Sequence, residues 1–157
     1  MHTITNRSRR HGDERGFTLI ELMVVVLIIA ILIGMAIPTF LGARQRAQDR
    51  AVQADLRNAL TAEKTYYTDG QAFTTDTSTL KMIETSLDWG GELSVSVGDA
   101  VTAGDSDVVC LEMTSTSGTT FSVADVAAGV NAGTYYGETG CPGAVSGASV
   151  AGLGSAW

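Results

Sequence analysis

The chain has 157 residues, of which 45% are hydrophobic and 17% charged, and its formal net charge is −7. This length leaves room for one ordinary domain and little more. The acidic balance offers no basic face for nucleic acid, and His2 and His11 are the only histidines, so we expect neither nucleic-acid binding nor enzyme activity.

The first 16 residues, MHTITNRSRRHGDERG, are polar and lack any periodicity. They carry four of the ten basic residues of the chain, all of them arginines. This composition predicts a cytoplasmic leader that is removed, rather than a folded element. A chain that starts at Phe17 has six basic and fifteen acidic residues, and therefore a net charge of −9.

Residues 17–43 form an apolar run in which Glu21 is the only charged residue. As a helix, Phe17 to Pro38 is about 33 Å long, which matches the hydrocarbon thickness of a bilayer. A secretory signal peptide is the main alternative, but its apolar region is usually only about 7 to 15 residues long and ends in a small-residue cleavage site. We therefore predict a membrane-spanning segment with the leader arginines inside.

Residues 44–68 continue the helical pattern with one apolar face and one polar face. Val52, Leu56, Leu60 and Tyr67 recur at helical spacing, which predicts an amphipathic helix that packs on another element. No helix breaker separates this segment from residues 17–43, so we expect one helix of about 76 Å up to Tyr67. Asp69-Gly70 then predicts its end.

The rest of the chain, residues 69–157, has the residue types of strands and turns. Alternating or β-rich stretches predict an antiparallel sheet of three or four strands, at residues 92–97, 107–113, 119–126 and 133–138. A short helical turn is expected within 80–87, and the Gly/Ser/Ala-rich end of the chain is expected to be flexible unless Trp157 docks it. The expected class is α+β, with a long N-terminal helix and a small β head packed on its second half.

The two cysteines, Cys110 and Cys141, lack the spacing of zinc or redox sites. We interpret them as a structural disulfide, which places the head outside the reducing cytosol. Two buried free thiols are the alternative.

Glu21 needs a partner, because an ionised carboxylate inside a bilayer is costly and is usually paired or functional. If proteolysis cuts after Gly16, the new α-amino group of Phe17 lies one helical turn before Glu21. This amine can neutralise the carboxylate in the same chain or in a neighbour, and such a pair favours one axial register between bundled helices.

The stretch from Gly16 to Val25, GFTLIELMVV, resembles the processing and methylation motif of type IV pilins and related pseudopilins. The resemblance implies the pilin fold, cleavage between Gly16 and Phe17, and N-methylation of Phe17. It also implies a prepilin peptidase, an assembly ATPase and a platform protein as partners. The subunit is then expected to span the inner or cytoplasmic membrane once before assembly and to form an extracellular homopolymer afterwards.

Gly34 and Pro38 weaken the helix locally, because Gly costs about 1 kcal/mol and interior Pro about 3 kcal/mol relative to Ala. In the family, the equivalent stretch often loses helical order inside the filament. We expect a kinked but continuous helix in the free subunit and a melted segment at residues 34–38 in the filament.

Asp99, Asp105 and Asp107 lie close together in the sequence, in GDAVTAGDSDVV, and are candidate calcium ligands. The spacing of an EF-hand is absent, so we expect a solvated acidic turn and no cofactor, with calcium as the alternative.

Three other functions stay open at this stage. The first is a pseudopilin of a type II secretion system, and the second is a minor pilin with a binding role at the filament tip. The third is a single-span protein that keeps its leader and displays a binding head, which leaves Glu21 unexplained. The main interpretation is a structural subunit that polymerises through its N-terminal helix.

Overall fold

The computed structural model describes residues 16–100 and 104–157, and the expected leader at 1–15 lies outside the described residues. The chain divides into two compact units, one ending at Leu41 and one that starts at Gly42. This division falls two residues before the boundary expected at residue 43. Helix α1 (Leu19–Gly70) contributes its first part to one unit and its second part to the other.

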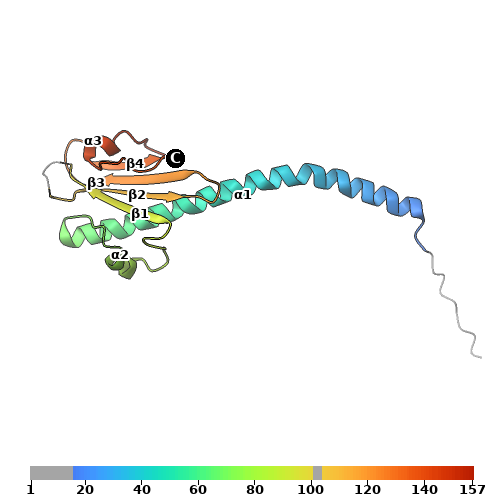
Figure 1. Cartoon of the computed structure of the whole chain (residues 1–157), viewed down its shortest axis with the longest axis horizontal. Helices are drawn as coiled ribbons and strands as arrows, with labels where there is room; N and C mark the ends of the chain where they lie inside the picture. Colours follow the sequence, from blue (N-terminus) through green and yellow to red (C-terminus); the bar gives the residue numbers. More distant parts are fainter. Residues whose placement is uncertain (1–15, 101–103) are drawn as a thin grey trace, which may run out of the picture. The chain divides into compact units, whose positions relative to one another are not determined.

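The second unit contains a four-stranded antiparallel sheet, as expected (Figure 1). Its strands are β1 (Leu93–Gly98), β2 (Val108–Thr114), β3 (Thr120–Val126) and β4 (Gly133–Gly137). They follow one another in space in the order of the sequence, and each strand pairs antiparallel with the next. The register sets Leu93 opposite Met113 and Val123 opposite both Leu111 and Tyr136.

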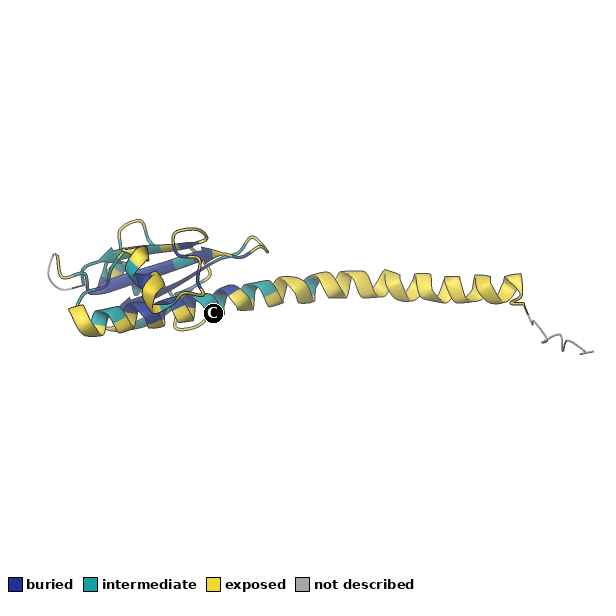
Figure 2. Cartoon of the chain, turned by 90° about the horizontal axis from the view of Figure 1, so that it is seen from below, coloured by how far each residue is buried: buried dark blue, intermediate teal, exposed yellow. Residues whose placement is uncertain are grey.

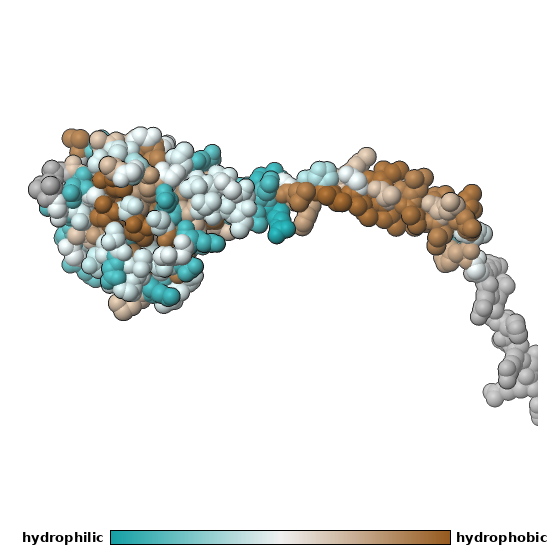
Figure 3. All heavy atoms as spheres, in the orientation of Figure 1, coloured by the Kyte–Doolittle hydropathy of each residue, from teal (hydrophilic) through white to brown (hydrophobic). Residues whose placement is uncertain are grey.

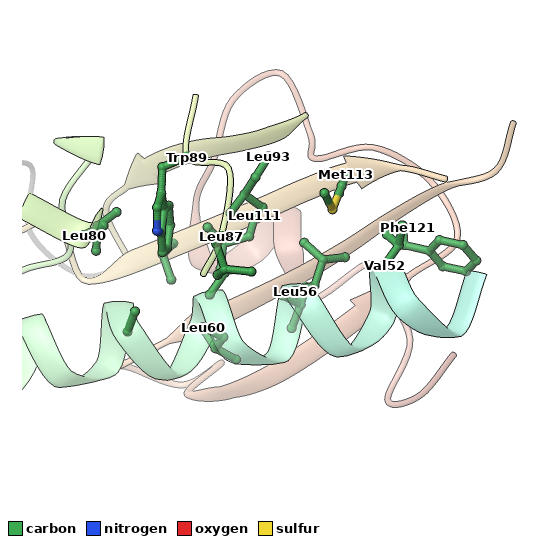
Figure 4. Packing of buried hydrophobic residues seen from close by; sticks show 14 of the residues in the cluster. Val52, Leu56, Leu60, Leu80, Leu87, Trp89, Leu93, Leu111, Met113 and Phe121 are labelled. Carbon is green, nitrogen blue, oxygen red and sulfur yellow. The ribbon is translucent and has the colours of Figure 1, made fainter. Parts of the chain in front are cut away.

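The second part of α1 packs on one face of this sheet, as its amphipathic pattern predicts. Its buried apolar residues lie at helical spacing and contact β-strand residues that point to the same side (Figure 4). Leu56 is fully buried, and so are Leu111 and Val123 of the sheet. Figure 2 shows the burial of this part of the helix as a stripe, with exposed residues on the turns that face away from the sheet. Burial of this apolar surface holds the head on the helix.

The opposite face of the sheet is also covered, by residues 141–153, which include the short helix α3 (Gly147–Val150). Val108, Cys110 and Val126 form a second buried cluster there with Val150. Because both faces are covered, β2 carries a continuous apolar run, Val108-Val109-Cys110-Leu111, in which every residue is fully buried.

The Cys110–Cys141 disulfide joins β2 to this covering segment, and its two cysteines lie 31 residues apart in sequence. The interpretation of the cysteine pair as a structural disulfide is therefore confirmed. The backbone N–H of Cys141 also donates to Glu112 Oε2 at 2.6 Å.

The end of the chain is ordered, so the prediction of a flexible tail is wrong. Trp157 docks this segment, which is the one condition under which the tail was expected to be ordered. The indole N–H of Trp157 donates to the carbonyl oxygens of Ser122 and Gly137, at 3.1 and 2.9 Å. The Arg57 guanidinium lies 4.7 Å from the centroid of the Trp157 ring. One aromatic side chain thus ties the last residues to β3, β4 and α1.

Of the two helix boundaries in this region, the start of α2 differs from expectation, whereas α1 ends at Gly70, as Asp69-Gly70 predicts. Helix α2 (Thr77–Ile83) begins before the helical turn that was expected within 80–87, because the Asp76 side chain caps it by accepting the Ser78 amide at 3.1 Å. Helix α1 runs through Gly70, and Gln71 takes the left-handed conformation that ends it, at φ 55.

Glu63 is a buried carboxylate on the sheet-facing side of α1 and has no exposed surface. Its Oε2 accepts the amide of Thr74 at 3.3 Å, whereas no partner reaches Oε1. Burial raises the pKa of this carboxyl from its ordinary 4.5 to about 7, and the Thr74 hydrogen bond opposes the shift only in part. Desolvation therefore dominates the electrostatics of Glu63.

We predict that Glu63→Gln removes a pH dependence of stability. Between pH 4.5 and 7 the folded state holds a proton that the unfolded chain has lost, so the unfolding free energy falls as pH rises through this range. The full loss is on the order of 3 kcal/mol, at 1.36 kcal/mol per pKa unit. Denaturant unfolding of the full chain in detergent micelles, followed by tryptophan fluorescence, measures this slope. The exposed control Glu138→Gln should keep it, and an unchanged slope in Glu63→Gln contradicts the assignment.

We also predict that Cys110→Ser/Cys141→Ser lowers the unfolding free energy by about 3.5 kcal/mol, because the disulfide closes a loop of this length in the unfolded chain. The same unfolding assay in micelles measures the loss, with the reduced wild-type chain as the matched comparison. A loss below about 1 kcal/mol would show that the second apolar cluster holds the end of the chain without the bond.

Candidate assembly and processing site

The residues around the expected cleavage position precede the helix. Gly16, Phe17 and Thr18 are not helical, and α1 begins at Leu19. The Phe17 side chain is exposed, with 84% of its surface accessible. Within the described residues, the peptide bond between Gly16 and Phe17 is thus outside regular secondary structure.

Glu21 has a local partner that the sequence interpretation missed. The Glu21 amide donates to Thr18 Oγ1 at 3.2 Å, and Glu21 Oε2 accepts the amide and the hydroxyl of Thr18 at 3.4 and 3.3 Å. Thr18 precedes the first helical residue, so these reciprocal bonds form a capping box. The pattern Thr-x-x-Glu before an apolar run is a known signature of this motif and was available in the sequence. The pairing of Glu21 with the Phe17 amine stays a prediction, because it concerns the cleaved chain.

Nothing in the described residues of its unit, 16–41, covers the apolar first part of α1. Its large side chains from Leu19 to Leu41 are between 47% and 74% exposed. Figure 3 shows them as a continuous hydrophobic surface along this part of the helix. Among the described residues, α1 is the one helix that is long and apolar enough to cross a membrane. Such a surface marks a site for lipid or for other protein chains.

Gly34 and Pro38 lie inside α1, which continues through both of them. Pro38 has no backbone N–H, so it cannot donate the helical hydrogen bond to the carbonyl of Gly34. The Thr39 hydroxyl donates to the Met35 carbonyl at 3.3 Å one residue further on. A Cβ at Gly34 would meet no atom within 4 Å, so the chain itself does not require a glycine there. The expectation of continuous helix in the free chain is confirmed.

The acidic loop uses its carboxylates to bind its own backbone. Asp99 Oδ1 accepts the Ser106 amide at 2.9 Å, and the Asp107 carboxylate accepts the Ala100 amide. Hydrogen bonds from the amides of Gly104 and Ser106 hold the pKa of Asp99 below its ordinary value. Asp105 is exposed. Across residues 16–100 and 104–157, no three acidic, histidine or cysteine side chains come together in a way that would hold a metal ion.

Comparisons with known proteins point to the same residues. The model of the prokaryotic N-terminal methylation motif matches residues 12–37. The chain is 43% identical over 68 residues to the type IV wide pilus major component PilA4 of Thermus thermophilus, which covers 43% of this chain and 52% of that protein. It is 33% identical over 93 residues to the type IV major pilin PilA of Myxococcus xanthus, covering 59% and 42%.

A second group of similar proteins belongs to type II secretion systems. The type II secretion system core protein G of Klebsiella michiganensis is 32% identical over 76 residues, covering 48% of this chain and 54% of that protein. The chain therefore spans about half the length of the curated relatives that it matches. It carries the prepilin methylation motif, and it is similar to both type IV pilins and type II secretion pseudopilins.

We predict that Thr18→Ala loosens the start of α1. Loss of the cap costs about 1 kcal/mol, so the Glu21 amide should exchange with solvent about fivefold faster. Hydrogen exchange of the full chain in micelles, read by NMR, measures this rate. Thr18→Ser keeps the hydroxyl and should keep the wild-type rate. Equal rates in Thr18→Ala and the wild type contradict the capping role.

Proposed function

We propose that this chain is the structural subunit of a type IV pilus-like filament and polymerises through the first part of α1. The observation that carries the proposal is the exposed apolar surface from Leu19 to Leu41, most of which lies within the matched methylation motif. A membrane can cover this surface before assembly, and the same segment of other copies can cover it in a filament.

Proteolytic processing takes the subunit from the membrane to the filament. A prepilin peptidase cuts between Gly16 and Phe17, and the new amine of Phe17 is methylated. The Thr18–Glu21 capping box holds the Glu21 carboxylate at this end of the helix. In this proposal the carboxylate then pairs with the amine of the same or a neighbouring chain. Pairing neutralises the buried carboxylate and selects one axial register. A platform protein and an assembly ATPase complete the machinery in this proposal.

The location follows from the same features. The subunit crosses the inner membrane once with the leader inside, and the filament is extracellular. The Cys110–Cys141 disulfide supports an oxidising location for the head. With the head outside the cytosol, the acidic residues that follow α2 give the fibre an acidic surface.

The second candidate is a pseudopilin of a type II secretion system, and it is favoured by the similarity to core protein G. A minor pilin at the filament tip is a third. Abundance separates them, because a major pilin is plentiful in material sheared from the cell surface, whereas a pseudopilin stays in the cell envelope and a minor pilin is scarce.

The experiment that tests the proposal is intact mass and N-terminal sequencing of the protein in sheared surface material. An abundant chain that starts at Phe17 and is heavier by one methyl group supports a processed filament subunit. A chain that starts at Met1, or after Ala43, and stays with membranes or medium refutes it.

We further predict that residues 34–38 lose helical structure in the filament, so that their amides are no longer protected from hydrogen exchange. Hydrogen exchange of assembled filaments should be faster at these residues than at residues 22–30, because Gly34 and Pro38 weaken the helix. Pro38→Ala restores an amide and should slow the exchange. Full protection of residues 34–38 in wild-type filaments excludes the melting.

A further inference from the structure

Four basic side chains lie along one flank of α1, at Arg46, Arg50, Arg57 and Lys64. Their spacings of four, seven and seven residues keep them within about 40° of one another around the helix axis. Arg44 lies on nearly the opposite flank. The four side chains thus form a basic stripe, on a flank of the helix next to the face that packs on the sheet.

Within the described part of the chain, only the two later members of this stripe have partners. Lys64 Nζ lies 2.8 Å from Asp125 Oδ1, and Arg57 lies over the ring of Trp157. Arg46 and Arg50 are exposed, and no carboxylate oxygen among residues 16–100 and 104–157 comes within 4 Å of either guanidinium. Half of the stripe is therefore available to another molecule.

In a single subunit, the position of Arg46 and Arg50 is unfavourable for membrane orientation. They follow the apolar segment on the side that the proposed topology moves across the membrane, where basic residues oppose the correct orientation. The adjoining flank of the helix carries the small exposed residues Ala43, Ala47 and Ala54, so a second molecule can approach the helix closely. Binding of an anionic partner to this surface gives Arg46 and Arg50 a function that they lack in the single chain.

The head of a second copy has the complementary charge. Residues 71–157 contain ten acidic residues and a single basic one. Two of the acidic residues, Asp88 and Glu92, flank one tight turn before β1, in which the Gly91 amide donates to the Asp88 carbonyl at 3.3 Å. Both side chains are exposed and neither accepts a hydrogen bond within the described residues.

The turn that carries these two carboxylates is anchored in the head. Trp89 is 8% exposed, lies in the main apolar cluster, and its indole N–H donates to the Glu84 carbonyl at 2.8 Å. A Cβ built at Gly91 would overlap Asp88 Oδ2, so the Asp88 side chain lies folded against this turn. Asp88 and Glu92 are thus two anions on a fixed support, and Arg46 and Arg50 are two cations one helical turn apart.

We propose that Arg46 and Arg50 of one copy bind Asp88 and Glu92 of a second copy, and that this contact sets the spacing of heads in the filament. The inference rests on the proposed polymerisation. The contact joins two different surfaces of the same chain, so it is heterologous and can repeat without closing, as a filament requires. It also offsets the repulsion between heads that carry a large net negative charge.

The test compares charge reversals in the full-length chain expressed with its assembly machinery. Arg46→Glu/Arg50→Glu should lower the yield of sheared filaments at least about tenfold relative to Arg44→Glu, the control on the opposite flank. Adding Asp88→Lys/Glu92→Lys to the first variant should restore most of the yield. Arg50→Cys with Asp88→Cys should give intermolecular disulfide ladders in filaments, whereas Arg44→Cys with Asp88→Cys should not.

Each outcome decides the proposal. Loss of yield without rescue and without ladders overturns it, as does a loss of the same size in Arg44→Glu. Weaker binding of Arg46→Glu/Arg50→Glu to phosphatidylglycerol vesicles, with normal filament yield, overturns it in favour of a lipid headgroup as the anionic partner. If the wild-type chain itself forms no filament, the proposed function fails, which is a result distinct from failure of this contact alone.

Discussion

The apolar surface of α1 from Leu19 to Leu41 is the constraint on which the rest of this account depends. Seventeen large hydrophobic side chains in this stretch are exposed, and nothing else in the described part of that unit covers them. Burial of each such side chain is worth about 1.5–3 kcal/mol. The segment therefore favours any environment that removes it from water, and the proposed membrane and filament states both do so.

The head, in contrast, needs no other molecule to cover its apolar surface, because it buries that surface itself. The second part of α1 covers one face of the sheet, and the segment tied down by the disulfide and by Trp157 covers the other. The head therefore does not depend on assembly for its core. This separation lets one chain combine a stable folded unit with a segment that is completed only by other molecules.

The sequence was sufficient to predict the long helix, the four antiparallel strands, the disulfide and the motif around Glu21. These rest on strong local signals, namely an uninterrupted apolar run, β-rich stretches between turns, and a specific pattern of residue types. Helix α2 was misplaced because the capping role of Asp76 was overlooked. The ordered end of the chain depends on contacts of Trp157 with residues 20 and 35 positions away, which no local pattern encodes.

The Thr18–Glu21 capping box and the buried Glu63 differ in how far the sequence predicts them. The Thr18–Glu21 capping box is local and could have been read from the sequence. Glu63 could not, because a glutamate in an amphipathic helix is usually solvated, whereas here it is buried and accepts the amide of Thr74, 11 residues away. The partners of Arg57 and Lys64 were likewise invisible, and they are what distinguishes these two residues from Arg46 and Arg50.

The most direct test of the central claim is a cryo-electron microscopy map of filaments sheared from the cell surface. The account predicts that residues 19–41 of each subunit are enclosed by the same segment of other subunits, and that lipid is absent. A filament held together by heads alone, with residues 19–41 missing, solvent-exposed or covered by lipid, would contradict it.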